Sequence, residues 1–218
     1  MATDKSKVAR RYDRWSGLYD FIDTFPGFGR AEKRWRREAI DMLDLQPGDR
    51  VLDVGTGTGL IVPWIADKLD SGKVIGTDIS EKMLERARER VEKLGLSSKA
   101  EFVKDDAEAM MFPDASFDKV IATYTLTTIP DPAAMMKEIH RVLKPGGILV
   151  LLDTGPPTET KGNTLYYWMK FTARLFGYTD ISRDPYKILA EAPPFTKCEE
   201  RRYYATTVYL MSLKKAGA

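Results

Sequence analysis

The sequence is poor in the residues that make covalent and metal cross-links. Its 218 residues include one cysteine, Cys198, and one histidine, His140. A single cysteine excludes an intrachain disulfide and is typical of a reducing compartment. One histidine and one cysteine also cannot form an all-His/Cys metal site, so we expect no metal centre.

Long hydrophobic runs are also missing. No apolar stretch reaches the roughly 18 residues that a membrane-spanning helix needs. The opening residues, MATDKSKVARR, lack the apolar core of a signal peptide. These absences predict a cytoplasmic protein, which could still lie at the inner face of a membrane.

Net charge is small, at +2, but it is unevenly distributed. Residues 1–37 hold ten Lys or Arg and five acidic residues, so this segment carries +5 and the rest of the chain carries −3. The same segment has seven aromatic residues. Basic residues interleaved with aromatic ones suit peripheral contact with an anionic membrane, and an ordinary lid helix with a solvated basic face explains them equally well. The near-zero total does not favour nucleic acid.

From about residue 50, short apolar runs alternate with amphipathic segments. The apolar runs predict five strands: Arg50–Val54, Lys73–Asp78, Ala100–Lys104, Phe117–Thr123 and Ile148–Asp153. The amphipathic segments predict three helices: Leu60–Leu69, Lys82–Leu94 behind an N-cap at Ser80, and Pro132–Leu143. Strands that alternate with helices imply a parallel sheet with right-handed crossovers.

The two ends of the chain depart from this alternation. Residues 1–48 are predicted to form a helical cap, and residues 49–218 the main domain. Cys198–Tyr204 and Thr206–Leu213 are rich in Thr, Tyr and Val, which predicts an antiparallel hairpin at the sheet edge. Between sheet and hairpin, an insertion at about 155–195 contains a helix with a mostly apolar face.

Three successive strand ends carry features that suit a nucleoside. Gly55, Gly57 and Gly59 follow the first strand, but Leu60 stands where a dinucleotide-binding loop has its last glycine. Asp78, 19 residues after Gly59, ends the second strand and could accept hydrogen bonds from ribose hydroxyls. The third strand is followed by a further polar stretch, Asp105-Asp106-Ala107-Glu108. Ligands of such sheets bind at this edge.

The motifs in this order resemble class I S-adenosylmethionine-dependent methyltransferases. The resemblance covers about residues 48–155 and is carried by VLDVGTGTG, VIGTDIS, FVKDDAEAMMFPDASFDKV and EIHRVLKPGGILVL. It implies a Rossmann-like α/β fold: a doubly wound, mostly parallel sheet of seven strands with a C-terminal antiparallel hairpin and an N-terminal helical cap. It also implies S-adenosylmethionine as cofactor and S-adenosylhomocysteine as product.

The resemblance further implies which residues bind the cofactor: Tyr19, Asp53, Gly55, Thr56, Gly57, Gly59, Asp78, Ile79, Asp106, Ala107 and Thr123. Asp53 and the glycine loop would hold the amino-acid end. Asp78 would accept from both ribose hydroxyls, with Ile79 on the adenine. Asp106 would accept from the adenine amino group, with the Ala107 backbone N–H at the ring.

Residues near the transferred methyl group are implied less directly. Tyr19 matches a lid tyrosine, with Tyr12 as a second candidate, and Tyr124 follows the fourth strand beside Thr123. The sulfonium methyl is already activated, so the protein mainly aligns the nucleophile and excludes water. Candidate catalytic residues are Tyr19, Tyr124 and Asp153, although Asp153 could instead cap a helix or loop.

The acceptor side of the chain leaves several alternatives. PDASFD and RVLKPGG resemble the ubiquinone/menaquinone C-methyltransferase branch, whereas RRYDRWSGLYD is as close to soluble bacterial phosphatidylethanolamine N-methyltransferases. The insertion at 155–195 has no clear match in the quinone branch. We therefore expect methyl transfer to a small apolar or lipid-like acceptor. The alternatives are phosphatidylethanolamine N-methylation at a membrane surface and a non-catalytic protein that binds S-adenosylmethionine.

Overall fold

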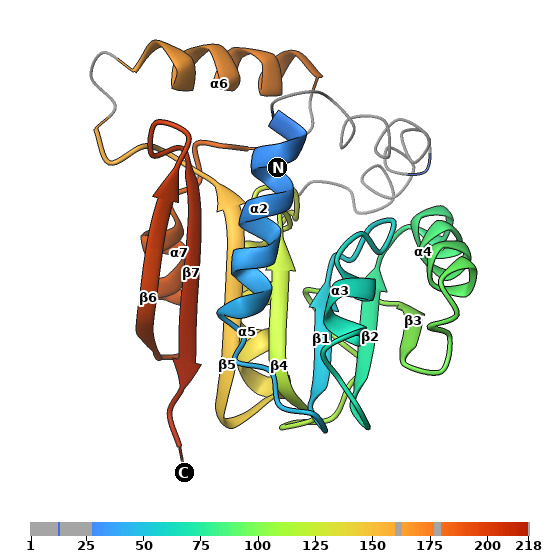
Figure 1. The fold of residues 1–218 in the computed structure, drawn as a ribbon. Coiled ribbons are helices and arrows are strands. Elements are labelled where there is room, and N and C mark those ends of the chain that lie inside the picture. Colours follow the sequence, from blue (N-terminus) through green and yellow to red (C-terminus); the bar gives the residue numbers. More distant parts are fainter. Residues whose placement is uncertain (1–12, 14–27, 160–162, 177–179, 218) are drawn as a thin grey trace.

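A computed structural model describes residue 13 and residues 28–159, 163–176 and 180–217. Its centre is a seven-stranded sheet in the order β3-β2-β1-β4-β5-β7-β6 (Figure 1). The strands are β1 (Arg50–Val54), β2 (Lys73–Asp78), β3 (Ala100–Lys104), β4 (Phe117–Thr123), β5 (Leu143–Thr154), β6 (Phe195–Tyr203) and β7 (Val208–Lys215). Strands β1 to β5 pair in parallel, and β7 is antiparallel to both β5 and β6. The expected fold class is thus confirmed.

Strand boundaries follow the apolar runs closely at the start of the sheet and less closely at its end. Strands β1 to β4 have the predicted bounds. Strand β5 begins at Leu143 rather than Ile148, because Leu143 pairs with Phe117 before the register shifts at the Lys144–Gly147 stretch. Strand β6 begins at Phe195, and the hairpin turn takes up residues 204–207.

Helices cover both faces of the sheet. They are α2 (Phe28–Asp41), α3 (Val62–Ala66), α4 (Glu81–Lys93), α5 (Pro132–Val142), α6 (Thr164–Phe176) and α7 (Pro185–Glu191). The N-cap prediction is confirmed, since the Ser80 hydroxyl accepts from the Met83 N–H. Helix α3 is shorter than the predicted Leu60–Leu69, because the last turn tightens into i→i−3 hydrogen bonds from Lys68 and Leu69. Helix α7 was not predicted.

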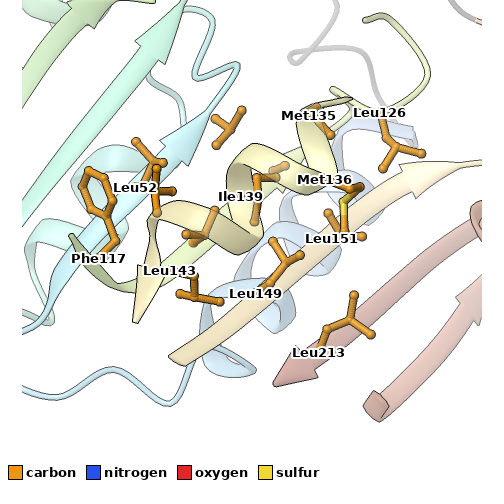
Figure 2. Close-up of a cluster of buried hydrophobic side chains, with 14 of the residues drawn as sticks. Leu52, Phe117, Leu126, Met135, Met136, Ile139, Leu143, Leu149, Leu151 and Leu213 are labelled. Carbon is orange, nitrogen blue, oxygen red and sulfur yellow. The ribbon is translucent and has the colours of Figure 1, made fainter. Parts of the chain in front are cut away.

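Successive residues of a central strand serve two separate cores. Val51 faces the core under α2, α3 and α4, whereas Leu52 faces the core under α5 and α7. Figure 2 shows the second core, in which Met135, Met136 and Ile139 of α5 meet the strand residues. With both faces covered, the strand ends are the part of the sheet left for a ligand.

Two expectations fall partly or wholly outside the described residues. Of the predicted cap over residues 1–48, helix α2 is described, and it packs on the sheet through Trp35, Ala39 and Ile40. Residues 1–12 and 14–27, which include Tyr12 and Tyr19, lie outside the described part. Within that part, no helix combines the length and the apolar character that crossing a membrane requires.

Candidate functional site

A cavity opens at the carboxyl ends of the parallel strands, where β1 lies between β2 and β4 and the strand order changes direction. This switch point is where open α/β sheets bind ligands. Most of the predicted site residues line the cavity: Gly55, Thr56, Gly57, Asp78, Ile79, Asp106, Ala107, Thr123 and Tyr124. Asp53, Gly59 and Asp153 do not.

The glycine loop after β1 has a backbone that only glycine adopts readily. Gly55, Gly57 and Gly59 have φ angles of 68°, 55° and 70°. A Cβ on Gly55 would lie 2.6 Å from the Thr125 hydroxyl, and one on Gly59 would lie 2.9 Å from the Ala87 Cβ. A Cβ on Gly57 would meet nothing within 4 Å. Gly55 and Gly59 therefore pack the loop against protein, whereas Gly57 leaves room for a ligand close to the backbone.

Asp53 supports this loop from the end of β1. Its side chain is buried, and its Oδ2 accepts from the Thr56 hydroxyl at 2.6 Å. Its other oxygen, Oδ1, has no hydrogen-bond partner among the described residues. Burial raises the pKa of Asp53 to about 6, although the Arg36 charge lowers it. A cation or hydrogen-bond donor near Oδ1 would favour the ionised form.

Asp78 joins the loop after β1 to the loop after β2. Its Oδ2 accepts from the Gly57 N–H at 3.0 Å, and its Oδ1 accepts from the Ser80 N–H at 2.9 Å. Burial raises its pKa to about 6, against the lowering effect of these backbone donors. Each carboxylate oxygen can accept more than one hydrogen bond, so the group keeps capacity for ligand hydroxyls.

The acidic stretch after β3 divides into two roles. Asp105 accepts from the backbone N–H groups of Asp106 and Met111, which folds the loop onto itself. Asp106 accepts from the Glu108 N–H at 3.0 Å and lines the cavity beside Ala107. Asp105 and Asp106 both line the cavity, and Asp105 also shapes the turn through its two backbone hydrogen bonds.

Arg36 of α2 is a cavity residue that the sequence reasoning missed. Its guanidinium donates to the Thr123 hydroxyl at 2.9 Å and to Glu32 at 2.7 Å, and both side chains of the ion pair are largely buried. It also lies 5.0 Å from the centre of the Tyr124 ring. No signal in the sequence separates Arg36 from its neighbours Arg34 and Arg37.

Tyr124 itself has an unusual backbone. Its φ of 57° is in the left-handed region, which is uncommon for a bulky residue and often marks a functional position. The Tyr124 N–H donates to Leu152 O at 2.7 Å, which fixes this turn at the end of β4. The ring thereby stays at the cavity wall beneath Arg36.

Asp153 does not line the cavity, and its carboxylate is hydrogen-bonded to other parts of the protein. Its two oxygens accept from the Thr127 hydroxyl at 2.7 Å, the Thr127 N–H at 3.2 Å and the Thr154 N–H at 2.7 Å. Burial raises its pKa to about 6. These hydrogen bonds hold the end of β5 to the loop after β4. Asp153 thus caps a loop, which is the second of the two roles expected for it.

A glycine loop with carboxylates at the next two strand ends, at the switch point of a parallel sheet, defines a Rossmann-like nucleoside-binding protein. The chain belongs to the family described as "Methyltransferase domain", whose model matches residues 45–193. It is 35% identical over 175 residues to a demethylmenaquinone methyltransferase of Geobacillus stearothermophilus, over 79% of this chain and 74% of the relative.

Two further similarities extend this result. A phosphatidylethanolamine N-methyltransferase of Cereibacter sphaeroides is 38% identical over 154 residues, which cover 68% of this chain and 71% of the relative. The crystal structure of the [4+2]-cyclase SpnF superimposes with a TM-score of 0.83 at 19% identity, over 100% of this chain and 98% of that one. The latter likeness concerns the fold alone.

The protein is accordingly a class I methyltransferase enzyme, and S-adenosylmethionine is its methyl donor. The cavity residues fit this cofactor. Gly57 leaves space at the loop, and Asp78 offers acceptor oxygens.

Proposed function

We propose that this methyltransferase acts on a small apolar or lipid-like acceptor. The observation that carries the proposal is the chemistry of the cavity wall. Beyond the polar strand ends and the residues assigned to the cofactor, the wall includes Leu60, Met83, Ile129 and Pro130. Demethylmenaquinone and phosphatidylethanolamine, which name the two relatives' acceptors, both have long apolar tails.

The proposed cofactor contacts follow the resemblance. The Gly55–Gly59 loop and Asp53 would hold the methionine end, Asp78 the ribose hydroxyls, and Asp106 the adenine amino group. Ile79 would pack on the adenine, and the Ala107 N–H would face its ring. Each of these contacts remains a proposal.

Arg36 adds one contact to this set. A guanidinium matches a carboxylate in shape and charge, and Arg36 lies beside Thr123 within the field of Asp53. We assign it to the carboxylate of the methionine end. Glu32 would keep the guanidinium plane oriented through its ion pair.

The bound cofactor supplies an activated methyl group, so the protein residues need to align the acceptor and exclude water. Tyr124 is the catalytic candidate supported by a position at the cavity wall. An amine acceptor needs only to be neutral, whereas a carbon acceptor must lose a proton. Tyr19, outside the described residues, stays a prediction for the lid.

Phosphatidylethanolamine N-methylation is the second candidate, favoured by the identity with the Cereibacter sphaeroides relative. Purified protein would be given S-adenosylmethionine with either demethylmenaquinone in detergent or phosphatidylethanolamine vesicles. We expect S-adenosylhomocysteine and a methylated lipid with one of the two. Lack of methylated product from both, alongside turnover of a water-soluble polar acceptor, would contradict the proposal. A salt-insensitive reaction in solution would contradict the membrane-surface variant.

A further inference from the structure

Helix α6 lies across the carboxyl edge of the sheet, above the hairpin of β6 and β7 (Figure 1). Its inner side is attached to the hairpin turn. Just before the helix, the Asn163 amide donates to Ala205 O at 3.1 Å, and within the helix the Met169 sulfur lies 3.9 Å from the Thr207 hydroxyl. Tyr166, on the same side, is 4% exposed. One face of α6 therefore packs on the rest of the protein.

The opposite side of α6 is also apolar, and it faces outward. Tyr167, Trp168 and Phe171 are 55%, 64% and 65% exposed. Their i, i+1, i+4 spacing puts the three rings on one face of the helix. A helix that is apolar on both sides is normally covered on both. Three large aromatic side chains together at one surface mark an interaction site.

The charges of α6 indicate what covers this face. The helix sequence, TLYYWMKFTARLF, contains two basic residues and no acidic one. Lys170 is exposed, and its Nζ lies 6.0 Å from the centre of the Tyr166 ring. Trp, Tyr and Phe favour the boundary between water and hydrocarbon, and Lys favours anionic headgroups.

The size of the face argues against a protein partner. An aromatic side chain buries about 150–250 Å², so three partly exposed rings fall short of the ~800 Å² per partner in a standard protein interface. A bilayer sets no such minimum, because its surface accepts a single amphipathic helix.

We infer that α6 docks on an anionic lipid bilayer by inserting Tyr167, Trp168 and Phe171 into the headgroup region. This inference rests on the proposed lipid-like acceptor, because docking brings the strand-end edge of the protein to the surface that contains such an acceptor. It assigns the docking role to α6 and does not involve the N-terminal segment.

Co-sedimentation with vesicles tests the inference. Full-length protein would be mixed with phosphatidylcholine vesicles, with and without phosphatidylglycerol. We expect binding that requires phosphatidylglycerol and weakens with salt. The double variant Trp168→Ala/Phe171→Ala should lower the partition coefficient about tenfold or more, since two interfacial side chains are lost. Met111→Ala is the matched control, because Met111 is also 65% exposed but lies outside α6.

Unchanged vesicle binding of the double variant would overturn the inference, as would absence of binding by the unmodified protein. Circular dichroism verifies that the variants are folded, and Lys170→Glu offers a second variant that keeps all three rings. Light scattering tests whether a second copy of the chain covers this face instead. A dimer that dissociates in the double variant would assign the face to that copy and overturn lipid docking.

Turnover separates this inference from the proposed function. If the double variant loses vesicle binding but still methylates a detergent-dissolved lipid, both proposals stand. If the unmodified protein methylates the dissolved lipid but ignores vesicles, only the docking role fails. If it binds vesicles through α6 but methylates no lipid, only the acceptor proposal fails.

Discussion

The guanidinium of Arg36 lies 5.0 Å from the centre of the Tyr124 ring, which ties helix α2 to the turn after β4 at the cavity wall. The contact joins a residue of the helical cover to one in a left-handed backbone conformation. Glu32 and Thr123 hold the guanidinium from two other sides. A fixed cation thus stands at the wall of the cavity.

Replacement of Arg36 by Lys is expected to weaken S-adenosylmethionine binding about tenfold. Lysine keeps the charge but cannot reproduce the planar fork that reaches Glu32 and Thr123 together. Isothermal titration calorimetry measures the change. Arg34→Lys is the control, because Arg34 is well exposed and pairs with Glu38 away from the cavity. Equal affinities of the two variants would remove Arg36 from the cofactor site.

Asp78→Ala is expected to weaken cofactor binding by about 2 kcal/mol or more, since charge-assisted hydrogen bonds to the ribose are lost. The loss should be larger than for Asp70→Ala, which removes an exposed carboxylate outside the cavity. Isothermal titration calorimetry of both variants measures their affinities for S-adenosylmethionine. An Asp78 variant that binds S-adenosylmethionine with the original affinity would refute the assignment.

Cofactor affinity should rise as the pH increases through about 6, the value to which burial raises the pKa of Asp78. Below that pH the carboxyl is protonated and is a weaker acceptor. Affinity measured between about pH 5 and 7.5 tests this, and Asp78→Asn should reduce the slope, leaving the part that comes from Asp53. A profile that keeps its full slope in the Asn variant would assign the titration to another group.

The same pKa shift makes folding stability fall with rising pH, whereas cofactor affinity is expected to rise. The pKa of Asp78 in the folded state is raised above the ordinary aspartate value of 3.8, so the native state binds more protons between these two values. The stabilising contribution of Asp78 is therefore full below about pH 4 and is lost as the pH rises through about 6. Comparison of urea unfolding of the original protein and Asp78→Asn across this range measures it.

Tyr209→Phe should leave stability unchanged or raise it by up to about 1 kcal/mol. The Tyr209 hydroxyl is buried without a partner among the described residues, and burial raises its pKa well above the usual range. Tyr203→Phe is the contrasting variant, because the Tyr203 hydroxyl donates to Glu38, and its loss should be destabilising. Denaturant unfolding measures both. Destabilisation of Tyr209→Phe as large as that of Tyr203→Phe would contradict the reasoning.

The sequence predicted best what depends on neighbouring residues. The bounds of β1 to β3 follow from short runs that end at Gly55, Asp78 and Asp105, and the Ser80 cap directly precedes an amphipathic helix. Arg36 was missed because its partner Thr123 is 87 residues away. The clamp formed by Asp153 on Thr127 likewise depends on how the end of β5 meets the loop after β4.

The hydrogen bonds from the Gly57 and Ser80 N–H groups to Asp78 join protein atoms on two neighbouring strand-end loops. These bonds within the protein restrain the conformations of both loops. Such preorganisation lowers the conformational entropy lost on association. The affinity for the methyl donor should then depend little on loop rearrangement, and the departing product should leave behind a loop that is ready for the next cofactor.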